Sequence, residues 1–180
     1  MIICQANRLS AFFNVRSKAI FLATFILCVD LLTKYWTQHD LPMMYSHAEN
    51  YPYGGIGVFK NLLGIEFSIT HAINYGAAWG ILHQHQFSLL IFRLLLVILL
   101  SIYAFFINKQ AHQRLPLTLI IAGATGNIID YFLYGHVIDM FNFIFWGYPY
   151  PVFNVADSAI TLGILGLLVQ NWRHQPVEKA

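Results

Sequence analysis

Long apolar runs alternate with shorter polar connections along the chain. Four runs are long enough to cross the hydrocarbon core of a bilayer as a helix, which takes about 20 residues. They cover roughly residues 19–36, 87–107, 115–133 and 152–172. The pattern therefore predicts a mainly α protein built on a bundle of four transmembrane helices.

The connection between the first two runs, about residues 40–86, has a different pattern. It is too polar to span a membrane and too long for a tight turn. From Ile65 to Thr70 apolar and polar residues alternate, a period of two that is typical of a strand with one buried face. Upstream, the glycine-rich residues 53–57 favour a turn or loop. We expect a small β-sheet on the membrane surface.

Composition and charge place and orient this bundle. With 58% apolar and 10% charged residues, the chain has too few polar groups to solvate a globule, so we expect a single integral membrane domain over residues 1–180. Basic residues flank the N-terminus, the second connection and the C-terminus, which predicts that these three regions are cytoplasmic. A net charge of +2, scattered along those edges, does not favour nucleic-acid binding. The flanking basic residues are Arg8, Arg16, Lys18, Lys109, Arg114, Arg173 and Lys179.

Two aspartates, Asp139 and Asp157, bracket the short aromatic connection between the last two runs, on the opposite, outer face. A carboxylate at the membrane surface is costly, so a pair of them indicates a functional site. In a confined site one carboxyl keeps its proton, while the other acts as general base on a water molecule. The residues predict aspartyl chemistry without a metal or other cofactor, and they do not decide which aspartate starts charged.

Other polar residues lie within or beside the apolar runs. Asp30 and Lys34 are four positions apart on one helix face, which favours a buried ion pair over a direct catalytic role. Asn74 is either a turn residue or part of a site. Gly123 belongs to a small-residue face that is typical of helix packing, whereas packing does not explain Asn127.

Five motifs occur in the order in which one known family carries them. The chain resembles lipoprotein signal peptidase, the type II signal peptidase of bacteria, from about residue 19 to residue 172. The matching runs are Asp30-Leu31-Leu32-Thr33-Lys34, Asn74-Tyr75-Gly76-Ala77-Ala78-Trp79, Gly123-Ala124-Thr125-Gly126-Asn127-Ile128-Ile129-Asp130, Gly135-His136-Val137-Ile138-Asp139 and Phe153-Asn154-Val155-Ala156-Asp157.

The resemblance implies a function and a set of site residues. The function is an intramembrane aspartyl endopeptidase that removes the signal peptide from diacylglyceryl-modified prolipoproteins by cutting before the lipidated cysteine. Asp139 and Asp157 correspond to the catalytic pair, and the supporting positions are Asp30, Lys34, Asn74, Gly123, Asn127, Asn154 and Ala156.

The resemblance also implies a location and partners. We expect a multi-pass monomer in the bacterial inner membrane, with cytoplasmic termini and an active site toward the periplasm. Its partners are the lipid-modified prolipoprotein and membrane lipids. The fold class is then a four-helix transmembrane bundle with a small periplasmic β-sheet and a short interfacial helix.

Departures from the family pattern leave alternatives open. Tyr131 stands where the family typically has arginine, Ala122-Gly123 replaces a pair of glycines, and the stretch 43–57 looks longer than usual. A divergent, non-catalytic lipopeptide-binding paralogue is one alternative. A small proton-relay or transport protein is another, although the aspartates cluster toward the outer helix ends rather than forming a path across the membrane.

Overall fold

The computed structural model describes residues 2–44, 55–76 and 86–173, and for residues 2–16 the backbone alone. The long helices are α1 (Ile2–Asp40), α2 (Gln86–Ile102), α3 (Arg114–Tyr134) and α4 (Val155–Arg173). A π-helical turn, η3 (Tyr103–Ile107), continues α2, and a 3-10 turn, η4 (Ala111–Gln113), precedes α3. Within these residues four helices are long and apolar enough to cross a membrane, as the sequence predicted.

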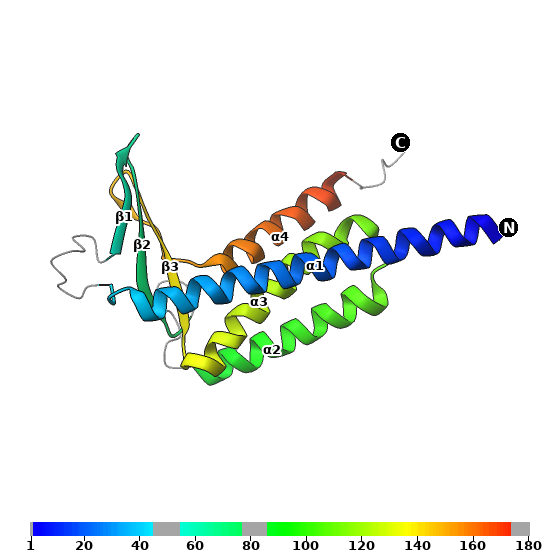
Figure 1. The fold of residues 1–180 in the computed structure, drawn as a ribbon, viewed down its shortest axis with the longest axis horizontal. Coiled ribbons are helices and arrows are strands. Elements are labelled where there is room, and N and C mark those ends of the chain that lie inside the picture. Colours follow the sequence, from blue (N-terminus) through cyan, green and yellow to red (C-terminus); the bar gives the residue numbers. More distant parts are fainter. Residues whose placement is uncertain (1, 45–54, 77–85, 174–180) are drawn as a thin grey trace, which may run out of the picture.

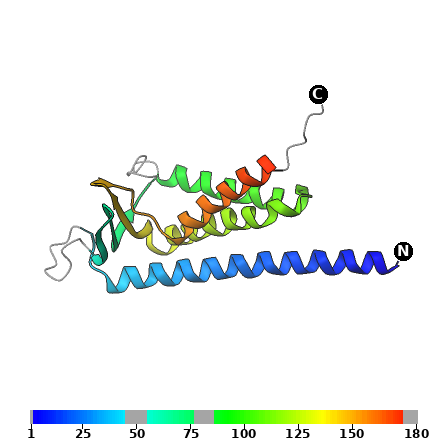
Figure 2. The same cartoon turned by 90° about the horizontal axis from the view of Figure 1, so that it is seen from above.

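The helices lie side by side, and the sheet caps one end of the bundle (Figure 1). The N-terminal end of α1, the connection between α2 and α3, and the C-terminal end of α4 all lie at the opposite end. Figure 2 shows α1 along one side of the other three helices and extending beyond them. The structure therefore places the N-terminal end of α1 and the C-terminal end of α4 at the same end of the bundle as the second connection.

Two helix boundaries differ from the sequence prediction. The helix α1 begins at Ile2, far before residue 19, because no breaker interrupts the more polar segment ahead of the apolar run. The helix α4 begins at Val155 rather than at residue 152. The preceding residues are extended because Phe153 exchanges backbone hydrogen bonds of 2.8 and 3.2 Å with Phe141.

The sheet is antiparallel, in the order β1-β2-β3-β4. Its strands are β1 (Gly55–Leu62), β2 (Ile65–Asn74), β3 (Val137–Phe145) and β4 (Tyr148–Pro149). The aromatic connection between the third and fourth apolar runs is thus a β-hairpin, with its turn at Trp146 and Gly147, both at positive φ.

The glycine-rich segment was partly misread. Gly55 to Gly57 begin strand β1 instead of forming a turn or loop, whereas Tyr53 and Gly54 lie outside the described residues. A Cβ atom at Gly55 would collide with the carbonyl oxygen of Ile69 on β2. The glycine therefore permits close pairing of two strands, a use of glycine that sequence alone does not distinguish from a turn.

The period of two in β2 is real, but the face that packs on the protein is the polar one. Ser68 and Thr70 on this polar face are buried. Phe67 and the apolar residues beside it on the opposite face are only half-buried. Ser68 Oγ accepts a hydrogen bond from Asn142 of β3 at 3.1 Å, so this buried hydroxyl group has a polar partner within the sheet.

The apolar face of the sheet carries stacked aromatic rings. Phe143 stacks on Phe67 with ring centroids 4.4 Å apart and on Phe153 with centroids 5.9 Å apart. Because side chains alternate along a strand, Asp139 of β3 projects on the same face as Phe141 and Phe143. One side of the sheet therefore joins an aromatic surface to a candidate site residue.

Some sequence predictions fall outside the described residues. They concern Ala77, Ala78 and Trp79 of the second motif and Lys179 near the C-terminus. No short helix lies at the sheet end within residues 2–44, 55–76 and 86–173, so the expected interfacial helix has no counterpart there.

Candidate active site

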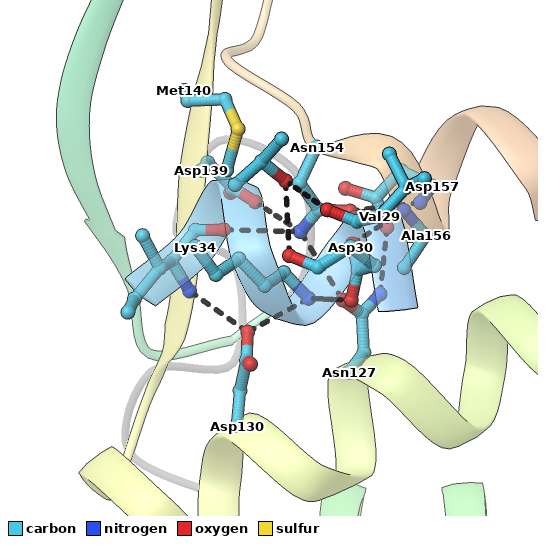
Figure 3. A network of polar contacts seen from close by, with 12 residues as sticks. Val29, Asp30, Lys34, Asn127, Asp130, Asp139, Met140, Asn154, Ala156 and Asp157 are labelled. Carbon is cyan, nitrogen blue, oxygen red and sulfur yellow. Dashed lines mark hydrogen bonds and ion pairs between the residues drawn. The ribbon is translucent and has the colours of Figure 1, made fainter. Parts of the chain in front are cut away.

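A buried lysine links two helices at the sheet end of the bundle. Lys34 Nζ lies 2.7 Å from Asp30 Oδ2 and 2.8 Å from Asp130 Oδ2, and the side chains of all three residues are 0% exposed. Figure 3 shows the lysine of α1 reaching between the two carboxylates. The ion pair between Asp30 and Lys34 confirms the prediction from their spacing, and Asp130 of α3 makes it a triad.

Each carboxylate of this triad also holds a backbone N–H group beside a candidate catalytic residue. Asp30 Oδ1 accepts a hydrogen bond of 2.8 Å from the N–H of Ala156, which directly precedes Asp157. Asp130 Oδ2 accepts one of 3.2 Å from the N–H of Ile138, which directly precedes Asp139. The triad therefore fixes the backbone at both candidate catalytic positions.

Asn154 connects the two candidate catalytic aspartates. Its Nδ2 group donates to Asp139 Oδ1 at 2.7 Å, and its Oδ1 atom accepts from the backbone N–H of Asp157 at 2.8 Å. The second bond makes Asn154 the N-cap of α4, with Asp157 in its first turn. An acidic residue in the first turn of a helix lies close to the partial positive charge of the helix N-terminus.

Two further asparagines donate to the pair. Asn127 Nδ2 donates to Asp157 Oδ1 at 2.8 Å, and Asn74 Nδ2 donates to Asp139 Oδ2 at 3.0 Å. Lys34 donates to Asn127 Oδ1 at 3.0 Å, which turns the amide so that its nitrogen faces Asp157. In Figure 3, Asn154 lies between Asp139 and Asp157, and Asn127 contacts both Lys34 and Asp157.

The two aspartates have different surroundings. Asp139 is 2% exposed, whereas Asp157 is half-buried. Burial, and secondarily the charge of Asp157, raises the pKa of Asp139 from its usual value of 3.8 to about 7. Hydrogen bonds from Asn74 and Asn154 and the charge of Lys34 oppose that rise only in part. The cause is the one expected for two carboxyl groups in a shared, poorly solvated site.

Two small residues allow the helices to approach at the site. A Cβ atom at Gly123 would collide with the carbonyl oxygen of Ala156, so α3 and α4 touch there through their backbones. Ala156 itself is fully buried. The packing interpretation of the small-residue face therefore agrees with the structure, and the close contact also positions the start of α4.

All nine residues singled out by sequence lie in this one region. The structure adds two that were not included. Asp130 could have been recognised because it lies three positions after Asn127, on the same helix face. The other is Arg93 of α2, whose guanidinium Nη2 donates to the carbonyl oxygen of Gly76 at 2.8 Å. Its only sequence signal is a charge within a long apolar run. No group of three or more metal-ligating side chains occurs among the residues described.

A model of the family described as Signal peptidase (SPase) II matches residues 22–173. The chain belongs to the signal peptidase II family. The match spans α1 from its apolar portion, both parts of the sheet and all three other helices, so it includes every residue of the site just described.

Individual relatives agree with this membership. The chain is 33% identical over 150 residues to a protein named lipoprotein signal peptidase from Chlamydia trachomatis serovar D, covering 82% of this chain and 89% of that one. It is 31% identical over 154 residues to a protein of the same name from Staphylococcus aureus strain bovine RF122 / ET3-1, covering 84% and 85%. A solved structure of a bacterial membrane enzyme, determined in meso at 2.3 Å resolution, shares 28% identity with a TM-score of 0.71, covering 91% and 94%.

Proposed function

We propose that this signal peptidase II is an aspartyl endopeptidase that cuts diacylglyceryl-modified prolipoproteins before the lipidated cysteine. The observation that carries the proposal is the amide-bridged pair Asp139 and Asp157, in which one carboxyl group is buried and the other sits at a helix N-terminus. Such different environments separate the proton affinities of two acids, as acid and base roles require.

The surroundings of the two aspartates support one division of the acid and base roles. Asp139, with its raised pKa, holds the shared proton and donates a hydrogen bond to the scissile carbonyl oxygen. Asp157, ionised at the first turn of α4, takes a proton from the attacking water as the new C–O bond forms. When the C–N bond breaks, that proton passes to the departing α-amino group of the lipidated cysteine.

The supporting residues hold the two aspartates in a fixed relative position. Asn154 contacts Asp139 through its nitrogen and the backbone of Asp157 through its oxygen, so it fixes their relative position. Such preorganisation lowers the cost of reaching the transition state because the donors need not reorient during reaction. The stacked rings on the same face of the sheet as Asp139 supply an apolar surface on which the substrate peptide can lie.

The position of the buried polar groups disfavours a proton-relay function. In the described part of the chain these groups gather at the sheet end, and only Gln113 lies at the other end of the bundle. The stretch of α3 between them carries buried Leu117, Ile120 and Ala122. A proton path would need polar groups through that stretch.

The test compares two substrates with the same peptide sequence. Purified protein is incubated with a diacylglyceryl-modified prolipopeptide and with its unlipidated twin, and the products are identified by mass. We expect cleavage before the modified cysteine, and much slower cleavage of the unlipidated peptide, because burial of acyl chains contributes about 0.8 kcal/mol per CH₂.

Two results would contradict the proposal. Equal cleavage rates for the two peptides would show that the enzyme does not require a lipid-modified substrate. Binding of the lipopeptide without any cleavage would instead identify a non-catalytic lipopeptide-binding protein.

The orientation of the protein in the membrane is tested by cysteine labelling. A cysteine at position 60 should react with an impermeant reagent from the periplasmic side, and a cysteine at position 110 should not.

A further inference from the structure

The helix α2 carries one charge in an otherwise apolar sequence. Between Gln86 and Ile107 the only charged residue is Arg93, which lies seven positions into the helix. At 1.5 Å per residue it is about 10 Å from the helix start. An arginine at that depth is costly unless its guanidinium finds a partner, so its presence calls for a function.

The partner of Arg93 is the backbone that follows strand β2. Its Nη2 group donates to the carbonyl oxygen of Gly76 at 2.8 Å. The N–H of the same glycine donates to Asn74 Oδ1 at 2.9 Å, and Asn74 Nδ2 donates to Asp139 Oδ2 at 3.0 Å. Three consecutive hydrogen bonds therefore lead from a membrane helix to the carboxyl group of Asp139. This residue and Asp157 are called the dyad below.

The middle bond of this chain sets the direction of the amide. An asparagine side chain has one acceptor atom and one donor group, so an oxygen engaged by Gly76 leaves the nitrogen facing Asp139. If the turn at Gly76 loosened, the amide could rotate and present its oxygen to the carboxyl. The position of Gly76 thus decides whether Asn74 supports or repels the ionised form of Asp139.

Building on the proposed peptidase function, we propose that Arg93 is a positioning residue of the reaction, which holds the turn at Gly76 so that Asn74 presents its donor to Asp139. Asn154 holds the other oxygen of Asp139 from α4. Arg93 thereby extends the support of the aspartate pair to α2, a helix that contributes no residue either to the lysine triad or to the pair itself.

Snorkelling alone does not account for this geometry. Arginines near helix ends commonly extend toward the interface and place their charge among water and headgroups. Arg93 instead donates to a backbone carbonyl two residues from Asn74. Nor is Lys34 available for this purpose, since it is committed to Asp30, Asp130 and Asn127.

The test uses steady-state kinetics of the full-length protein on the lipidated prolipopeptide. We expect Arg93→Met to lower kcat about 10-fold, with KM changed less than about twofold, because the loss concerns the dyad rather than substrate binding. Arg93→Lys, which can still donate to the Gly76 carbonyl, should recover kcat to within about threefold of wild type. Phe92→Leu, a lipid-exposed neighbour, is the matched control and should leave both constants unchanged.

A double-mutant cycle with Asn74→Ala decides whether the effect passes through Asn74. In that background Arg93→Met should have almost no further effect on kcat, within about twofold. If the two losses instead multiply, if only KM changes, or if every Arg93 variant unfolds, the inference is wrong. Wild type and Asp139→Asn are measured in the same assay. A wild type that does not cleave overturns the proposed function and this inference together, whereas a cleaving wild type with multiplying losses overturns only the inference.

Discussion

Two pairs of aspartates lie at the sheet end of the bundle, and they differ in what stands between their members. Asp30 and Asp130 share the cation of Lys34, at 2.7 and 2.8 Å. Asp139 and Asp157 share only the neutral amide of Asn154, which touches the carboxyl of one and the backbone of the other. The same residue type is therefore placed in two electrostatic settings within one site.

The difference separates a structural role from a chemical one. The cation of Lys34 offsets the charge of both buried carboxylates at short distance, which suits a structural role. An amide carries no charge to offset two carboxylates, and in the proposed mechanism this pair therefore holds the one proton that is exchanged with the substrate. The carboxylates of the lysine triad in turn accept hydrogen bonds from the backbone N–H groups of Ile138 and Ala156. These two residues directly precede Asp139 and Asp157.

The largest expected effect is on the amide-bridged pair. Asp139→Asn and Asp157→Asn should each lower cleavage of the lipidated peptide by at least about 10³-fold, because each removes either the proton donor or the base. The double variant should be no worse than the singles, since the two acids act as a unit. Product formation is measured by mass, with folding checked by thermal unfolding in detergent.

Asp130→Asn is the matched control for that comparison. It changes an acid of the same site that is hydrogen-bonded to the backbone beside Asp139. Its cleavage rate should fall by about 10-fold at most, because it alters positioning rather than proton transfer. If Asp130→Asn were as inactive as Asp139→Asn, or if either dyad variant turned over readily, the division between the two pairs would be wrong.

The second effect is on stability. Lys34→Met leaves Asp30 and Asp130 buried without their cation, and removing one partner of a buried ion pair costs about 3–5 kcal/mol. We expect a large decrease in Tm in detergent, and part of it should return when Asp130→Asn is added. Lys18→Met, on the exposed part of α1, is the control and should leave Tm unchanged. An unchanged Tm for Lys34→Met would show that the triad is not the structural element proposed here.

The apolar runs in the sequence were enough to predict the four membrane-spanning helices. The details that were not predicted correctly have physical causes. A run of about 20 apolar residues has few alternatives to a membrane helix, so all four spans were found. Gly55 was misread because turns and close strand pairing both favour glycine. The alternation in β2 predicted one buried face but not which one, and the polar face is the buried one because apolar residues do not have to face the interior in a protein surrounded by lipid.

Helix geometry predicted contacts within the site only between residues that are close in sequence, and the residues far apart in sequence were grouped by the resemblance to a family. Asp30 and Lys34 lie one helical turn apart, so their pairing followed from helix geometry. The contact of Arg93 with Gly76 joins residues 17 positions apart across a strand end and a helix, and no periodicity reports it. The positions of Asp139 and Asp157 relative to Asn154 depend on where α4 begins, which composition alone placed three residues too early.

A third effect concerns pH. With the pKa of Asp139 raised to about 7, the dyad loses its shared proton as the pH passes that value, so kcat should decrease above about pH 7. The hydrogen bond from Asn74 lowers this pKa, so Asn74→Ala should move the decrease to higher pH. Between its unfolded value near 3.8 and about 7, Asp139 binds a proton only in the folded state, so its contribution to the free energy of unfolding decreases as the pH rises through that window. A kcat profile that is flat up to pH 9, or a shift to lower pH in Asn74→Ala, would contradict the assignment of the proton to Asp139.

The smallest effect should come from the position where the family typically has arginine. Tyr131 is half-buried at the end of α3, one residue after Asp130, and its ring lies edge-on to Phe132 with centroids 6.2 Å apart. It donates no side-chain hydrogen bond to the dyad or the triad among the described contacts, and Arg93 already supplies a guanidinium to the turn beside Asn74. Tyr131→Arg should therefore raise kcat/KM for a generic lipidated peptide by no more than about threefold, and it should leave the need for both dyad aspartates intact.

The same substitution is then made in the Arg93→Met variant, where the introduced arginine could replace the guanidinium that has been lost. If it recovers activity there but not in the wild type, the two cations are interchangeable supports of the amide-bridged pair. A gain of tenfold or more in the wild type would instead show that Tyr131 limits this enzyme, as expected of a paralogue with reduced activity.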